Sequence, residues 1–227
     1  MQFLQELDFD PQEENILGID ETGVGDYFTP IISCCAFLLK EMINWTYEIG
    51  VRDSKLLNDD KIDKIASILI KKIPFAVYVL TQSGYNKMIN KGFNANVIKF
   101  FIHTQSILNF QKRYEFDKKI IIDKYSTLNA INNYQRKMSF IRDFSEFYKK
   151  NELMYFLEHG EQKIQAIACA SIIARHYLNN YMKNQNDKWG FNFLLGANQK
   201  VKSQINEFTK KFGKQNLEKV IKTNFKI

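Results

Sequence analysis

Apolar residues along the first third of the chain fall into short runs and one helical repeat. Residues 16–19 and 31–39 are apolar runs rich in β-forming residues, separated by a glycine-bearing stretch. Such runs, bounded by turn residues, are typical of buried strands, so we predict two neighbouring strands joined by a turn. Helical spacing predicts a helix over residues 58–72, capped by Asn58, and residues 75–80 return to a strand pattern.

The rest of the chain continues this alternation and then becomes helical. Residues 94–113 predict a helix with one apolar face, and residues 118–122 predict a strand that ends at Asp123. A short strand is predicted over residues 153–157 and a long apolar helix over residues 162–182. The tail predicts helices over residues 201–211 and 215–223. This order of elements indicates a mixed α/β layer.

The length and composition are those of one soluble domain. The 227 residues, 45% of them hydrophobic, can fill a sizeable core. No stretch resembles a flexible linker and no internal repeat is found, with only three prolines and ten glycines in the chain. We therefore expect a single domain over residues 1–227. We also expect the protein to act as a monomer.

Charge and cysteine usage narrow the class of protein. The net charge of +7 favours anionic partners such as nucleic acid, although many basic proteins have no such partner. Cys34, Cys35 and Cys169 lack the spacing of a disulfide framework or a zinc site. The acidic start, residues 1–12, does not resemble a signal peptide, and no apolar run reaches membrane-spanning length. We expect a cytoplasmic protein without membrane attachment.

Two of the predicted strands end in carboxylates. Asp20 and Glu21 directly follow residues 16–19, and Asp123 follows residues 120–122. Adjacent carboxylates at a buried strand repel one another. A shared cation would explain the pair if the strand ends there and the backbone turns. Explanations without a ligand stay open, because the pair can end a strand in solvent and Asp123 can begin a turn.

A series of motifs points to a family more specifically than any one carboxylate does. Glu161 alone, for instance, is explained by the favourable charge at a helix N-terminus. The motifs, in chain order, are Asp20-Glu21-Thr22-Gly23-Val24-Gly25-Asp26-Tyr27-Phe28-Thr29-Pro30, Asp53-Ser54-Lys55-Leu56, Gly92-Phe93-Asn94-Ala95-Asn96, Ile121-Ile122-Asp123, and Glu161 followed by Ala170-Ser171-Ile172-Ile173-Ala174-Arg175. Over nearly the whole chain their order and spacing resemble bacterial ribonuclease HIII, a branch of the type 2 ribonuclease H family.

The resemblance implies a fold, a reaction and a metal. It implies a ribonuclease H-like fold, in which helices flank a central mixed sheet and the C-terminal region is helical. The implied reaction is hydrolysis of the RNA strand of an RNA/DNA hybrid, with Mg²⁺ or Mn²⁺ held by the family's four carboxylates, here Asp20, Glu21, Asp123 and Glu161. Hard divalent cations prefer such oxygen ligands. We expect Asp20 to bridge two ions about 4 Å apart, and products with 5′-phosphate and 3′-hydroxyl ends.

The first motif suggests how RNA is distinguished from DNA. Glycines in the turn Gly23-Val24-Gly25 would let backbone amides approach the 2′-hydroxyls and phosphates of the RNA strand. Tyr27 is the one aromatic ring that we expect to face substrate. In the related ribonuclease HII branch an arginine stands between the glycines and the last carboxylate is usually aspartate, so Val24 and Glu161 place this sequence nearer the HIII branch.

Other motifs suggest contacts to phosphate. Lys55 is the best candidate, with Ser54 as a second donor, although a solvated lysine at a helix start would also explain Lys55. Asn94 and Asn96 could donate to phosphate or sugar, but capping of a helix by Asn94 is equally compatible with the sequence. A basic patch on the tail helices, or simply a solvated face, would account for Lys200, Lys202, Lys210, Lys211 and Lys214.

Two departures from the family pattern affect the expected substrate contacts. Members commonly carry an N-terminal substrate-binding domain, for which the sequence before Asp20 leaves no room, so we expect weaker binding of hybrid. His159 stands where the family has a lysine before the fourth carboxylate, and it is close enough in sequence to Glu161 to assist proton transfer or product release. We expect His103 and His176, which fall in helical segments, to be structural or surface histidines.

Two other functions are compatible with parts of this pattern. A non-catalytic nucleic-acid-binding module would keep the fold, but its four carboxylates would repel phosphate in the absence of metal. A different metal-dependent nuclease on the same fold, such as a resolvase-like enzyme, would act on DNA duplexes with the same carboxylates.

Overall fold

Six strands form one mixed sheet within residues 2–114, 119–150 and 153–223, the part of the chain that the computed structural model describes. Across the sheet their order is β1 (Gln2–Leu4), β6 (Leu153–Leu157), β5 (Ile120–Asp123), β2 (Ile16–Thr22), β3 (Ile31–Leu38) and β4 (Phe75–Leu80). The β2–β3 and β3–β4 pairs are antiparallel, and the other neighbours run parallel. The five predicted strands are confirmed, except that the expected start of one, Lys118, lies outside the described residues.

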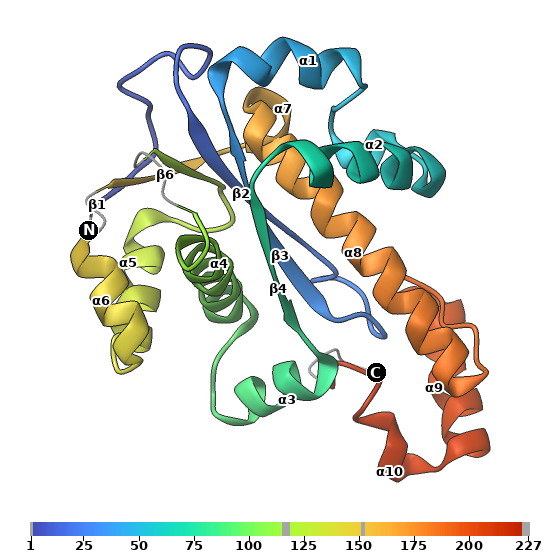
Figure 1. The fold of residues 1–227 in the computed structure, drawn as a ribbon. Coiled ribbons are helices and arrows are strands. Elements are labelled where there is room, and N and C mark those ends of the chain that lie inside the picture. Colours follow the sequence, from blue (N-terminus) through green and yellow to red (C-terminus); the bar gives the residue numbers. More distant parts are fainter. Residues whose placement is uncertain (1, 115–118, 151–152, 224–227) are drawn as a thin grey trace.

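Helices cover both faces of this sheet (Figure 1). On one face α8 (Gln165–Trp189) packs against β2 and β3, and α2 (Asp59–Lys72) packs against α8. On the other face α4 (Ala95–Gln111) contacts β3 and β4, with α5 (Leu128–Met138) beside it. The remaining helices are α1 (Ile43–Glu48), α3 (Gln82–Asn90), α6 (Arg142–Lys150), α7 (Gly160–Lys163), α9 (Gln199–Phe212) and α10 (Lys214–Leu217), with 3-10 turns at Lys40–Met42 and Ser54–Leu56.

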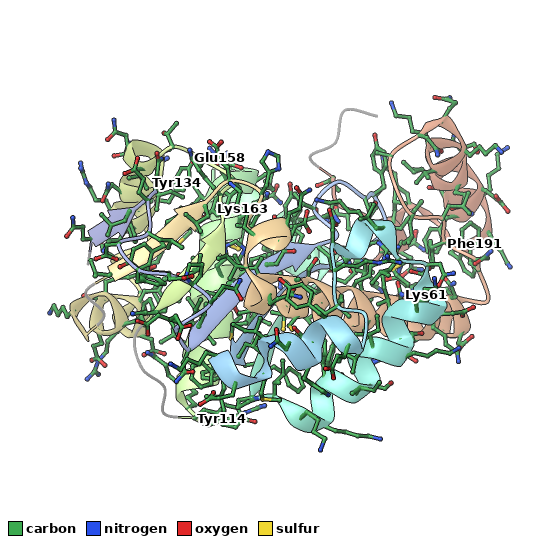
Figure 2. All side chains as sticks on the ribbon, turned by 90° about the horizontal axis from the view of Figure 1, so that it is seen from above. Lys61, Tyr114, Tyr134, Glu158, Lys163 and Phe191 are labelled. Carbon is green, nitrogen blue, oxygen red and sulfur yellow. The ribbon has the colours of Figure 1, made fainter. Side chains whose placement is uncertain are left out.

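The sheet separates the apolar core into two main clusters. One includes Ile65, Ile172 and Phe208 from the α2, α8 and α9 side, and the other includes Phe100 and Tyr134 from the α4 and α5 side. Seen from above, Phe191 of the first cluster and Tyr134 of the second lie toward opposite ends of the molecule (Figure 2). No described helix is long and apolar enough to cross a membrane.

Local sequence accounts for several helix boundaries. The Asn58 side chain accepts a hydrogen bond from the Lys61 amide and caps α2, as predicted. Asn94 caps α4 in the same way by accepting from the Val97 amide. At Gly18 a Cβ atom would lie 2.3 Å from the backbone carbon of Ala166, so only glycine allows α8 to approach β2 this closely.

The structure corrects two boundaries that matter for function. Strand β2 runs to Thr22 because pairing with β3 continues as far as Ile32, so the Asp20–Glu21 pair lies inside the strand rather than after it. In the tail, the predicted helix over residues 215–223 is wrong. Helix α10 ends at Leu217, and Val220, Ile221 and Lys222 turn into the core.

Candidate active site

Four carboxylates line one cleft at the edge of the sheet where β2 and β5 end. Strands β2 and β5 are parallel neighbours with Ile19 opposite Ile122, so the residues that follow, Asp20 and Asp123, lie side by side. Helix α7 adds Glu161, and β2 also supplies Glu21. A further carboxylate, Asp59 of α2, lines the cleft but is paired with Arg175; the cleft has a volume of about 610 Å³. Polar and basic residues that share it include Ser54, Lys55, Lys99, Ser171 and Arg175.

The side chains of the adjacent residues Asp20 and Glu21 contact helices on opposite faces of the sheet. Successive residues of a strand point to opposite faces, and here Asp20 hydrogen-bonds to Ser171 of α8 whereas Glu21 contacts α4. Glu21 Oε2 lies 2.8 Å from His103 Nε2, and Glu21 Oε1 lies 2.7 Å from Lys99 Nζ. We expected the strand to end at this pair, but β2 continues to Thr22. The two carboxylates therefore line one cleft from within the strand.

The two carboxylates have opposite pKa shifts. Burial, followed by the charges of Glu21 and Asp123, raises the pKa of Asp20 well above its usual value. Burial works in the same direction at Glu21, but the hydrogen bonds and positive charges of His103 and Lys99 outweigh it and lower the pKa of Glu21 to about 2. Positively charged protein groups thus stabilise the ionised form of Glu21, whereas burial and neighbouring carboxylates disfavour the ionised form of Asp20.

Asp123 and Glu161 are held by different parts of the chain. The Asp123 Oδ1 atom accepts a 2.7 Å hydrogen bond from the Gly160 amide, and Lys55 Nζ donates to Glu161 Oε1. The hydrogen bond to Glu161 raises the pKa of Lys55, whereas burial of Asp123 raises the pKa of that carboxyl group. His159 is exposed and adopts a left-handed backbone conformation, with φ of 57°, directly before Gly160.

The donor set fits a hard divalent cation. Its ligand atoms are carboxylate oxygens, and the charge repulsion that raises the pKa of Asp20 is what a cation would relieve. Among the described residues, no three histidine, cysteine, aspartate or glutamate side chains already converge as metal ligands. The reason is visible in the contacts, because Glu21 is turned to α4 and Glu161 to Lys55.

The glycine turn borders the carboxylates. Gly23 has φ of 83°, and a Cβ there would lie 2.2 Å from the Pro30 carbonyl oxygen, so the position requires glycine. Gly23 and Val24 line the cleft. A Cβ at Gly25 would meet no atom within 4 Å and its φ is not in the left-handed region, so the fold itself does not demand glycine there.

Some expected substrate contacts are brought to the cleft and others are not. Ser54 and Lys55 line it, and the Ser54 hydroxyl lies 2.8 Å from that of Ser171. The expectation that Tyr27 faces substrate is wrong, because its ring is only 2% exposed. Asn94 is engaged as the cap of α4, and neither it nor Asn96 lines the cleft of the described structure.

Sequence reasoning missed Lys99, His103 and Arg175. His103 was expected to be structural, yet it contacts Glu21 directly, together with Lys99. The available signal was a spacing of four residues, which places two side chains on the same face of a helix. It applies to Lys99 and His103 in α4, and to Ser171 and Arg175 in α8. His176, by contrast, pairs with Asp63 of α2 at 2.7 Å, as a structural histidine would.

Comparison with known proteins identifies the family of this chain. The model of the ribonuclease HII family matches residues 17–227. Ribonuclease HIII of Phytoplasma mali is 33% identical over 210 residues, which cover 92% of this chain and 70% of that protein. Ribonuclease HIII of Bacillus mycoides is 31% identical over 213 residues, or 93% of this chain and 66% of that protein.

A solved structure supports the same assignment. Bst-RNase HIII in complex with Mn²⁺ superposes with a TM-score of 0.83 and 27% identity, covering 94% of this chain and 67% of that one. The chain thus spans about two thirds of the length of the proteins it matches. From the family match, the identities and the shared fold, the chain belongs to the ribonuclease HII family of metal-dependent ribonucleases, and within it to the ribonuclease HIII branch.

Proposed function

We propose that this chain cuts the RNA strand of RNA/DNA hybrids, with Asp20, Glu21, Asp123 and Glu161 as the metal ligands. One observation carries the proposal: four carboxylates from β2, β5 and α7 share a cleft with the glycine turn, in a chain of the ribonuclease HII family. We further propose that it acts as a cytoplasmic monomer and that residues 1–227 form one domain.

Residues of the chain would divide the work between holding charge and orienting substrate. When bound, Mg²⁺ or Mn²⁺ activates water and stabilises the leaving 3′-oxygen, which yields 5′-phosphate and 3′-hydroxyl ends. His103 and Lys99 keep Glu21 ionised and fixed in orientation. Lys55 and Arg175 supply positive charge to the cleft, which favours a phosphate beside the carboxylates.

The glycine turn is the element that would recognise ribose. Gly23 and Val24 lie beside the carboxylates, and the absence of a side chain at Gly23 allows backbone amides to come close to a 2′-hydroxyl. Because Val24 replaces the arginine of the HII branch, we predict poor incision at a single ribonucleotide embedded in DNA. Efficient incision there, compared with a continuous hybrid in the same assay, would contradict this prediction.

Cleavage of a labelled hybrid with Mg²⁺, Mn²⁺ or chelator tests the proposal. Asp20→Asn should abolish cutting, whereas Asp143→Asn, which alters an exposed carboxylate on α6, should cut like the unmodified protein. RNA and DNA duplexes serve as controls. Preference for DNA duplexes would favour a resolvase-like nuclease, and binding of hybrid without cutting under any metal would favour a non-catalytic binding module.

A further inference from the structure

Lys222 is a buried lysine outside the carboxylate cluster. Its ammonium donates three hydrogen bonds: to the Gly23 carbonyl oxygen at 2.6 Å, the Thr29 carbonyl oxygen at 2.6 Å and the Thr29 Oγ1 at 3.0 Å. The Thr29 hydroxyl in turn donates to the Gly23 oxygen at 3.0 Å. Residues 23–29, which follow the catalytic strand, therefore wrap around a single ammonium group.

The segment that carries Lys222 is anchored from both sides. Its backbone amide donates to the Tyr27 carbonyl oxygen at 2.9 Å. From α3, Asn86 Nδ2 donates to the Ile221 carbonyl at 2.8 Å, and Asn86 Oδ1 accepts from the Thr223 amide at 2.9 Å. In Figure 1 the chain accordingly returns after α10 to the neighbourhood of α3 and β4. Lys222 thus reaches the glycine turn from a fixed support.

Peptide geometry links this contact to the cleft. The described residues contain no cis peptide bond, and in a trans peptide the carbonyl oxygen and the following N–H point in opposite directions. Because Lys222 draws the Gly23 carbonyl inward, the Val24 N–H must point away from the ammonium. Gly23 and Val24 both line the carboxylate cleft. We propose that Lys222 is a positioning residue that orients the Val24 amide for contact with the 2′-hydroxyl of the RNA strand.

A space-filling role alone does not explain this lysine. Burying an ammonium is unfavourable unless its hydrogen bonds are satisfied, and a methionine would fill similar volume at less cost. Burial lowers the pKa of Lys222 to about 7, against the opposing charge of Asp26. The hydrogen bonds to three oxygen atoms of the turn offset the cost of burying this ammonium group.

The test rests on the proposed cleavage of hybrid and compares ribose with deoxyribose. Hybrids with one 2′-hydroxyl near the cut site replaced by hydrogen identify the position at which the unmodified protein loses most kcat/KM. For Lys222→Met we expect kcat/KM on the full hybrid to fall about tenfold, the worth of one hydrogen bond, and the penalty for the missing hydroxyl to shrink by a similar factor. Lys219→Met alters an exposed lysine whose side chain donates to the nearby Asn216; it is the matched control and should retain both values.

A parallel loss on both substrates, with the deoxyribose penalty unchanged, would overturn the proposal. If Lys222→Met does not fold, Thr29→Val replaces it, because this change removes the hydroxyl that links Lys222 to the Gly23 oxygen. Thr29→Val, like Lys222→Met, should make the loss of kcat/KM caused by the missing 2′-hydroxyl smaller.

A readout independent of activity separates this inference from the proposed function. The three-bond HN–Hα coupling of Val24, measured by NMR on labelled protein, reports the orientation of the Gly23–Val24 peptide. It should shift toward a conformational average in Lys222→Met and remain unchanged in Lys219→Met. An unchanged coupling in Lys222→Met rejects the positioning role, even if the unmodified protein cuts no hybrid at all.

Discussion

Asp20 and Glu21 are neighbours in sequence, yet the fold treats their charges in opposite ways. Glu21 is paired with Lys99 and His103, whereas Asp20 faces burial and the like charges of Glu21 and Asp123. A carboxyl group whose pKa is raised by folding binds protons more readily in the native state than in the unfolded state. Its ionised form therefore lowers the free energy of unfolding until a cation is bound.

Asp20→Asn should raise the stability of the metal-free protein while abolishing cleavage. The penalty from ionised Asp20 is fully present above its raised pKa and is relieved as pH falls through that value. The gain in Tm with chelator present should therefore be larger at pH 8 than at pH 5. Added Mn²⁺ should raise the Tm of the unmodified protein more than that of the variant. A variant less stable than the unmodified protein at pH 8 would contradict this account.

His103→Leu should weaken metal binding without unfolding the protein. His103 contacts Glu21 at 2.8 Å, and loss of a residue that orients a metal ligand typically costs about 10- to 100-fold in affinity. Titration calorimetry with Mn²⁺ measures the affinity. His176→Leu removes a histidine that pairs with Asp63 of α2, and neither residue lines the cleft; this control variant should bind Mn²⁺ normally.

Packing of α8 on β2 sets the frame of the site at the scale of elements. The helix crosses the strand at Gly18, two residues before Asp20, and it supplies Ser171 and Arg175 to the cleft. On the opposite face α4 presents Lys99 and His103 one turn apart. The geometry of the site therefore depends on the packing of α8 and α4 against opposite faces of the sheet that contains β2.

Gly18→Ala should separate α8 from β2. Its Cβ would lie within 2.6 Å of three backbone atoms of Ala166 and Ile167, which cannot move aside as a flexible side chain would. We expect the free energy of unfolding to fall by at least about 2 kcal/mol, as for overpacked cores, in urea denaturation. Gly25→Ala, where a Cβ meets nothing within 4 Å, should leave stability nearly unchanged. Equal stability of the two variants would show that the close approach is relieved elsewhere.

The charge of the whole molecule bears on how hybrid is captured. The net charge is +7, and Lys200, Lys210 and Lys211 are exposed on α9, whose Val201, Ile205 and Phe208 are buried in the core. Charge held on a rigid, well-anchored helix can follow a phosphate backbone, but it carries no information about sugar or sequence.

Replacing these three lysines by glutamine should weaken nucleic-acid binding without changing specificity. Affinity for hybrid and for DNA duplex should fall in parallel, and the slope of log K against log salt should become shallower by roughly one per lost phosphate contact. Fluorescence anisotropy with the inactive Asp20→Asn background measures both. An unchanged salt slope would mean that the lysines form only a solvated face.

Local order of residues was enough to predict five of the six strands of the described structure, the cap of α2, the family, and four carboxylates that the fold brings to one cleft. These depend on hydrophobic periodicity, on capping side chains and on motifs that are contiguous in the chain. Short helices such as α3 and α5 were not predicted. Tyr27 was expected to be exposed to substrate but is buried, because burial of a side chain depends on what the rest of the chain packs against it.

The partners of the site belong to the folded chain alone. Strand alternation sends Asp20 and Glu21 toward different helices, and which helices those are follows from the order of strands across the sheet. Lys222 lies 199 residues from Gly23 in sequence, and only the return of the chain after α10 brings its ammonium to the turn. Contacts between such distant residues leave no periodic signal, since they arise when separate elements pack together.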